Sequence, residues 1–286
     1  MRLLRNIILI CFLITAGIYG AVFARQKITE DNQSPVITAD SDEITVSVQD
    51  MDENLLQGMS ASDDKDGDVT SSLVVVSKND FITKGTRKVN YAAFDSHNNV
   101  GIYTRKITYS DYRSPRFRSE KPFHFVYSDD GSSSTVFSQV TASDVLDGDL
   151  TASIRVVYGS ASESGTVYPV VMSVTNSAGD TASISVNAYR EDTTSFAIPT
   201  PALREYIVYT SVGERINPAR YLTGYYRNGF KTDFSNDSRY HEEDIQWDDS
   251  TVDYSTPGEY VIIYRLLNNE ETEGELGQAE LYVIVE

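Results

Sequence analysis

Cysteine is almost absent from this chain of 286 residues, because the single one, Cys11, lies in a hydrophobic run near the N-terminus. The rest of the chain therefore forms no internal disulfide, and thiol chemistry is excluded there. A eukaryotic secreted array of small domains normally carries disulfides, so their absence favours a bacterial protein. Cys11 itself is flanked by Ile10 and Phe12, without the small neighbours that a lipid-attachment site needs.

Basic residues are also few. The chain has 24 Lys and Arg against 42 Asp and Glu, which gives a formal net charge of −18. Such a surface repels the phosphate backbone of nucleic acids, so nucleic-acid binding is excluded as a function. The same surface keeps the protein soluble and attracts divalent cations.

Histidine is scarce as well, and His97, His124 and His241 lie in three different stretches of the chain. A histidine metal site or a catalytic triad needs its side chains to converge. The sequence contains no Gly-x-Ser-x-Gly, Gly-x-Gly-x-x-Gly or His-Glu-x-x-His motif, which are signatures of hydrolase, dinucleotide and zinc-protease chemistry. The sequence therefore predicts a protein that is not an enzyme. An extracellular hydrolase, or an accessory protein of one, with its site in 201–286 is kept as an alternative.

Only one long hydrophobic run is present. Residues 7–24 are uncharged and mostly apolar, Arg2 and Arg5 precede them, and Arg25 ends them. A run of 18 residues exceeds the usual core of a cleaved signal and is just long enough to span a membrane. We expect an uncleaved single-pass anchor in the cell membrane, with the basic N-terminus inside and the remainder extracellular. Cleavage after Ala24, which would give a secreted protein, is the alternative.

The most informative pattern is an internal repeat. The tract at 61–70, ASDDKDGDVT, returns at 142–151 as ASDVLDGDLT, 81 positions later. Ser34-Pro35 and Ser114-Pro115 repeat at a spacing of 80. A period of this length corresponds to a whole small domain. The sequence therefore predicts a tandem array, and arrays usually display, space or bind.

Short alternating runs dominate the repeats. Residues 44–48, 102–109 and 182–189 alternate apolar and polar side chains, which is typical of strands with one buried face. Residues 281–285 are predicted as a final strand. Frequent turn residues between such runs favour β-sandwiches. We predict an all-β protein with a signal anchor and spacer at 1–32, Ig-like domains at 33–111 and 112–192, a linker at 193–200 and a divergent Ig-like domain at 201–286. Residues 221–243 are predicted as a long loop or insertion.

The repeats resemble the bacterial Ig-like domains found in tandem on exported proteins, including the Ig-like repeats of a pesticidal crystal protein. The resemblance lies in an initial Pro, a D-x-x-D-G-D-[VIL]-T tract, a Gly-Thr before a strand and a later Asp/Asn turn. The two repeats supply these as Pro35, 63–70, 84–86 and 95–99, and as Pro115, 144–151, 165–166 and 176–180. The resemblance covers 33–192 well and 201–286 loosely. It implies Ig-like β-sandwiches at a cell surface without a catalytic site.

The Asp tracts are the candidate metal sites. Their carboxylates are of the kind that Ca²⁺ takes as ligands, six to eight oxygens at a time. The alternative is an Asp-Gly turn in which the carboxylates accept backbone N–H bonds. The candidate ligands are Asp63, Asp64, Asp66, Asp68, Asp144, Asp147 and Asp149.

Aromatic residues in the third stretch are the candidate ligand-binding side chains. Tyr225, Tyr226 and Trp247 could stack on sugar faces or anchor a protein partner, or they could fill the core of the domain instead. The preferred function is a non-enzymatic cell-surface stalk, adhesin or interaction module whose partner is cell wall, a surface protein or a glycan. A carbohydrate- or cell-wall-binding protein with recognition on the third domain is the main alternative.

Overall fold

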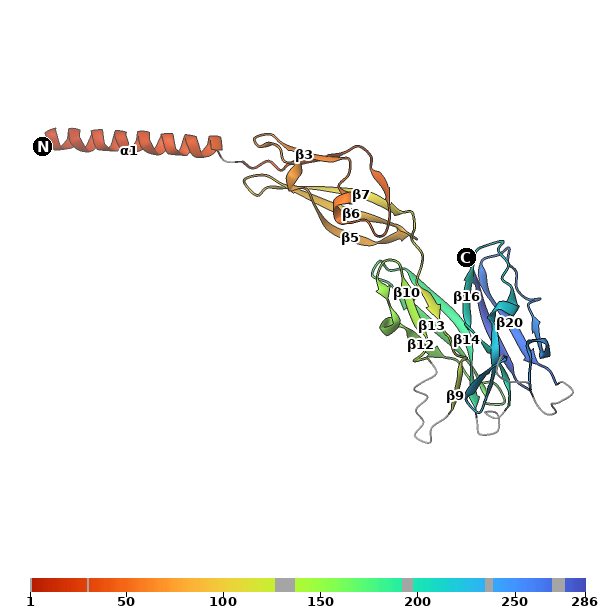
Figure 1. Cartoon of the computed structure of the whole chain (residues 1–286). Helices are drawn as coiled ribbons and strands as arrows, with labels where there is room; N and C mark the ends of the chain where they lie inside the picture. The colour runs from red at the N-terminus through yellow and green to blue at the C-terminus, as the bar shows by residue number, and fades with distance from the viewer. Residues whose placement is uncertain (1, 30, 127–136, 192–197, 235–238, 269–275) are drawn as a thin grey trace. The chain divides into compact units, whose positions relative to one another are not determined.

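The computed structural model describes residues 2–29, 31–126, 137–191, 198–234, 239–268 and 276–286. One N-terminal helix is followed by tandem β-sandwiches (Figure 1), so the predicted fold class is confirmed. The chain divides into two compact units, Met1–Asp111 and Tyr112–Glu286.

The first unit begins with the helix α1, Arg2–Thr29. Its segment Leu4–Arg25 has a mean hydropathy of 2.5 and buries none of its residues in the protein. At about 1.5 Å per residue, these 22 residues rise about 33 Å, which matches the apolar core of a bilayer. The length and composition of α1 fit a membrane span or a signal helix.

The sandwich of the first unit has a three-stranded and a four-stranded sheet. The order is β1-β3-β4 in one sheet and β2-β7-β6-β5 in the other, and only the β2–β7 pair is parallel. Alternate side chains such as Ile37, Ala61, Val89 and Ile107 fill the space between the sheets. The strands are β1 (Val36–Ala39), β2 (Glu43–Val46), β3 (Met59–Asp63), β4 (Gly67–Asp68), β5 (Val74–Thr83), β6 (Thr86–Phe94) and β7 (Val100–Tyr109), with a short helix α2 (Asp52–Leu55).

The second unit contains two sandwiches of the same design. The first of them has sheets β8-β10-β11 and β9-β14-β13-β12, and the next has β15-β17-β18 and β16-β21-β20-β19. The β9–β14 and β16–β21 pairs are parallel, like β2–β7. The strands of the earlier sandwich are β8 (Arg116–Arg118), β9 (His124–Val126), β10 (Thr141–Asp144), β11 (Gly148–Asp149), β12 (Arg155–Tyr158), β13 (Val167–Thr175) and β14 (Thr181–Glu191).

The later sandwich covers most of the third predicted domain. Its strands are β15 (Thr200–Leu203), β16 (Ile207–Thr210), β17 (Leu222–Arg227), β18 (Phe230–Asp233), β19 (Ile245–Asp248), β20 (Gly258–Leu266) and β21 (Gln278–Val285). The prediction of a long loop over 221–243 is wrong, because β17 and β18 pair as a hairpin there. Thr200, expected in the linker, already belongs to β15, and 192–197 lie outside the described residues.

The two sandwiches of the second unit share one continuous hydrophobic core. The ring of Phe123 meets the edge of Tyr282 at 5.7 Å between centroids. The backbone N–H of Asn187 donates to the Tyr282 hydroxyl at 2.7 Å, and the backbone N–H of Tyr206 donates to the Ser119 carbonyl at 2.8 Å. The second and third predicted domains are therefore joined through a shared core and do not form two separate modules.

Candidate functional site

The first Asp tract is a turn between β3 and β4. Asp63 ends β3, and its Oδ1 accepts the backbone N–H groups of Lys65 and Asp66 at 2.9 and 3.0 Å. Gly67 has φ of +72°, a left-handed conformation that glycine adopts without steric cost. The Asp-Gly turn that the sequence offered as an alternative is present, and it fixes one oxygen of Asp63.

The same turn meets the loop that joins β6 to β7. The Asp66 carboxylate accepts the backbone N–H of Ser96 at 2.7 Å and its hydroxyl at 3.0 Å. These two hydrogen bonds lower the pKa of Asp66. Asp95 accepts the N–H groups of His97 and Asn99, both at 2.8 Å, and the Asn99 side-chain amide at 2.6 Å. Burial opposes ionisation of Asp95, but these hydrogen bonds outweigh it and lower its pKa.

Four carboxylates converge at this place. One oxygen each from Asp31, Asp63, Asp66 and Asp95 lies within 4.8 Å of the others. Asp31, Asp63 and Asp95 are buried, with exposed fractions of 6%, 8% and 8%. We call these four residues the acid cluster. The sequence predicted Asp63 and Asp66 as ligands, but it did not predict Asp31 or Asp95.

Asp64 and Asp68, the other two predicted ligands of the first tract, do not join the acid cluster. Both side chains are exposed. The Asp68 carboxylate accepts the backbone N–H of Thr70 at 2.9 Å, which places it at the start of the next turn. The hydroxyl and the N–H of Thr70 lower the pKa of Asp68.

The second tract forms the same turn with a different chemistry around it. Asp144 Oδ1 accepts the N–H groups of Leu146 and Asp147 at 3.0 and 2.7 Å. Asp147 accepts the Ser177 N–H and hydroxyl, both at 2.6 Å. Asp149 accepts the N–H of Thr151 at 2.9 Å, as Asp68 does with Thr70. All three predicted residues therefore have donors within the protein.

Two of the four acid-cluster positions are neutral in the second repeat. At the spacing of 81, Tyr112 stands where the first repeat has Asp31, and Asn176 stands where it has Asp95. The Asn176 side-chain amide donates to Asp144 Oδ2 at 2.8 Å and to the Tyr112 hydroxyl at 2.7 Å. The Tyr112 hydroxyl donates to Asp180 at 2.7 Å. Neutral donors replace two carboxylates, so no second acid cluster of this kind forms among the described residues.

The three aromatic candidates are not brought together. Tyr225 is buried and meets Tyr240 edge-on at 4.9 Å between ring centroids, so it fills the core and has no face for a ligand. Trp247 lies on β19 with 40% of its surface exposed, beside Tyr264 at 6.5 Å. Tyr226, on β17, points to the other side of the strand from Tyr225 and lines a pocket.

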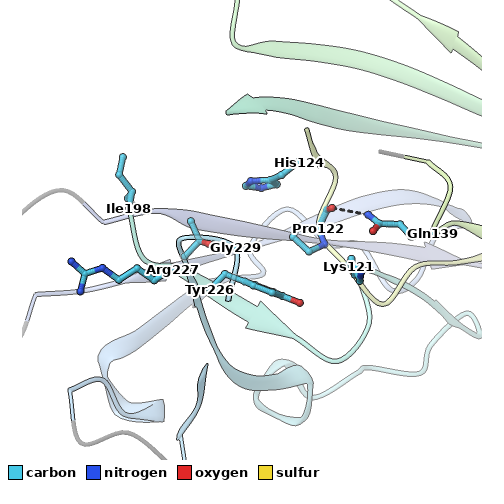
Figure 2. A pocket seen from close by; sticks show the side chains of 9 residues that line it. Lys121, Pro122, His124, Gln139, Ile198, Tyr226, Arg227 and Gly229 are labelled. Atoms are coloured by element: carbon cyan, nitrogen blue, oxygen red, sulfur yellow. Dashed lines mark hydrogen bonds between the residues drawn. The ribbon is translucent and has the colours of Figure 1, made fainter. Parts of the chain in front are cut away.

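That pocket lies within the second unit, between its two sandwiches (Figure 2). It has a volume of about 210 Å³, and side chains from both sandwiches surround it. The Gln139 side-chain amide donates to the Pro122 carbonyl at 3.0 Å at its edge. Burial raises the pKa of Tyr226, so its hydroxyl stays protonated and able to donate. The lining residues are Lys121, Pro122, His124, Gln139, Ile198, Thr200, Tyr226, Arg227 and Gly229.

The sequence pointed to Tyr226 but to none of the other residues of this pocket. Lys121 and His124 precede Tyr226 by about one hundred positions. They meet it only because the two sandwiches share a core. No spacing rule in the sequence predicts that contact.

No family model matches the chain, and no curated protein matches it. A solved structure of the second CBM51 domain, in complex with GlcNAc, and INT domains of Clostridium perfringens ZmpB is 16% identical, with 55% of this chain and 42% of that chain covered and a TM-score of 0.23. The M60 catalytic domain of the same protein with two CBM51 domains is 13% identical, with 90% and 31% covered and a TM-score of 0.22. Mouse cadherin-23 EC22-24 is 12% identical, with 89% and 99% covered and a TM-score of 0.20.

The chain thus spans less than half the length of the two Clostridium structures that it resembles. We draw no functional argument from these similarities.

Proposed function

We propose that the protein is a non-enzymatic, membrane-tethered array of Ig-like β-sandwiches on the outer side of a cell membrane, where it serves as a stalk and interaction module. One observation carries this proposal. None of the residues of the apolar segment Leu4–Arg25 is buried in the protein, and tandem β-sandwiches follow α1 in the chain. A helix of this length and composition is suited to span a membrane. Arg2 and Arg5 favour an inward N-terminus.

The placement of the polar side chains supports a role without catalysis. His97 lies in the first unit, while His124 and His241 belong to different sandwiches of the second. Within the described residues, they do not converge with a nucleophile in the way that a triad requires. The acid cluster brings four carboxylates together, and a binding role fits it.

Protease protection of membrane vesicles tests the proposed topology. The full-length protein is expected to sediment with membranes. In right-side-out vesicles, external protease should digest the part of the chain that follows residue 31. Its mass before digestion distinguishes an uncleaved anchor from cleavage after Ala24. Recovery of the intact chain in the soluble cell interior would overturn the proposal.

A second candidate function is recognition of a glycan or cell-wall polymer by the second unit. The specific observation is the pocket in which the Tyr226 ring and hydroxyl lie near Lys121 and Arg227. Sugar-binding sites combine an aromatic face with a few well-placed polar groups in a concave surface. The two cationic side chains stand out in a protein of net charge −18. They favour a carboxylate-bearing sugar over a neutral one.

A further inference from the structure

The acid cluster leaves two buried oxygens without a donor. Asp31 Oδ2 and Asp63 Oδ2 are inaccessible to solvent and accept no hydrogen bond, and both residues are more than nine-tenths buried. Buried polar groups in proteins are almost always paired, with protein, water or an ion. A buried carboxylate beside other carboxylates is costly unless a positive charge pairs with it. These two oxygens therefore indicate a missing ligand.

The other oxygens of the cluster are held in place from outside. Asp31 Oδ1 accepts the Gln33 N–H at 3.1 Å, and the Asn99 side-chain amide donates to the Asp31 carbonyl at 3.1 Å. Asp63 Oδ1 is held by its own turn. Each of these carboxylates is thus fixed through one oxygen, while the other is buried and accepts no hydrogen bond. Outer hydrogen bonds of this kind orient the ligands of metal sites.

The positive charge nearby does not satisfy the cluster. Lys65 Nζ lies 3.7 Å from Asp31 Oδ1, and its side chain is 37% exposed. One ammonium against four carboxylates leaves a strong negative excess. His97 also stands beside Asp31 and Asp66, but it is exposed and its Nδ1 lies 3.1 Å from the Ser96 hydroxyl. A small, highly charged cation would compensate this negative charge better than either side chain does.

We propose that Asp31, Asp63, Asp66 and Asp95 bind one calcium ion in the first sandwich. The ligands offered are carboxylate oxygens, which hard cations prefer, and no thiolate is available to favour zinc. Calcium tolerates six to eight oxygens in flexible geometry, with water completing the shell. Magnesium demands a nearly ideal octahedron and keeps most of its water, so a cluster of four fixed carboxylates suits it less.

The position of the ligands assigns the ion a structural task. Asp31 lies two residues beyond the end of α1, Asp63 is the last residue of β3, and Asp95 follows β6. The ion joins the segment that leaves α1 to two loops of the first sandwich. Calcium therefore couples the entry of the chain to the folded unit, and its loss releases that segment. The second repeat achieves the same closure with Tyr112 and Asn176, without an ion.

Isothermal titration of the full-length protein in detergent micelles with calcium chloride tests the proposal. We expect one site per chain with a Kd of about 1 mM or tighter, in the range of extracellular modules. Asp95→Asn, which copies the second repeat, should weaken binding at least about tenfold. Asp64→Asn is the matched control, because Asp64 belongs to the same tract but lies outside the cluster, and its Kd should not change.

A gain of affinity separates this prediction from misfolding. Lys65→Gln removes the ammonium that lies beside Asp31 and should tighten calcium binding severalfold while the fold is kept. No calcium binding by the wild type would overturn the proposal, as would an Asp95→Asn variant with unchanged affinity. Equal weakening by Asp64→Asn and Asp95→Asn would also contradict it, because it would indicate diffuse attraction to an acidic surface.

Discussion

At the residue scale, two substitutions decide what each repeat can do. Asp31 and Asp95 in the first repeat correspond to Tyr112 and Asn176 in the second. The backbone turns and the serine contacts are the same in both. The first repeat places two donorless carboxylate oxygens in the interior, whereas the second places an amide and a hydroxyl there. In our proposal the first network takes up a cation from solution, whereas the polar groups of the second pair with one another.

Asn176→Asp tests that contrast within the second unit. The change removes the amide that donates to Asp144 Oδ2 and sets two carboxylates side by side. We expect the free energy of unfolding to fall by about 1–3 kcal/mol, the usual cost of leaving a buried polar group unpaired. Urea unfolding followed by circular dichroism measures it.

Asn217→Asp is the matched control for this variant. Asn217 caps a short helix by accepting the Ala219 N–H, a role that aspartate fills equally well. Equal stability of Asn176→Asp and Asn217→Asp would mean that the Asn176 network carries no stabilisation of its own.

The sequence predicted the tract residues of the acid cluster because four acids within six positions form a visible pattern. Asp31 and Asp95 have no such local signal, since each stands 32 positions from Asp63. Only the fold brings them together. The alignment of the two repeats does contain a clue, because both positions are acidic in the repeat that has the unpaired oxygens and neutral in the other.

At the element scale, the hairpin of β17 and β18 is the clearest difference between expectation and structure. Its turn is Asn228-Gly229, with φ values of +53° and +76°. Positive φ at both central residues is typical of the two-residue turns that match strand twist, and Asn-Gly is their sequence signal. Aromatic and glycine residues on both sides obscured the alternation of the strands, so the segment resembled a loop.

This hairpin also carries the test of the second candidate function. Tyr226→Ala should weaken binding to a carboxylate-bearing glycan or to purified cell wall at least about tenfold, which corresponds to about 1.4 kcal/mol. The reason is that it removes the aromatic face and the hydroxyl of the pocket. A glycan array followed by calorimetry measures the change.

Phe230→Ala supplies the control in the same hairpin. Phe230 is 77% exposed and does not line the pocket. An equal loss of glycan affinity in the Tyr226→Ala and Phe230→Ala variants would place recognition on the exposed hairpin surface and not in the pocket. Binding that neither variant alters would count against a glycan site here.

At the scale of the whole molecule, all three sandwiches have the same strand order although the third lacks the Asp tract. Each pairs a three-stranded sheet with a four-stranded sheet that has one parallel edge pair. The strand alternation and the turn residues specify this topology. The tract adds a local turn and, in the first repeat, the acid cluster. The sequence could therefore predict the fold of the third stretch without its most distinctive motif.

The fusion of the second and third sandwiches could not be predicted in this way. Residues such as Phe123, Tyr206 and Tyr282 are apolar or aromatic whether they face their own core or a neighbour. Their contacts across the two sandwiches make the second unit one cooperative block. The first unit has its own core and, in our account, its own ion.

Differential scanning calorimetry of the full-length protein in detergent, in EDTA and in excess calcium, tests this account most directly. We predict two transitions, one for each unit. Calcium at about one hundred times its Kd stabilises the unit that binds it by about 2.7 kcal/mol, which corresponds to a rise of roughly 10 °C or more for a domain of this size. Only one transition should move, and Asp95→Asn, whose Kd is at least about tenfold weaker, should reduce that movement by about half or more at the same calcium concentration. A calcium-insensitive profile, or a shift of both transitions together, would contradict the account.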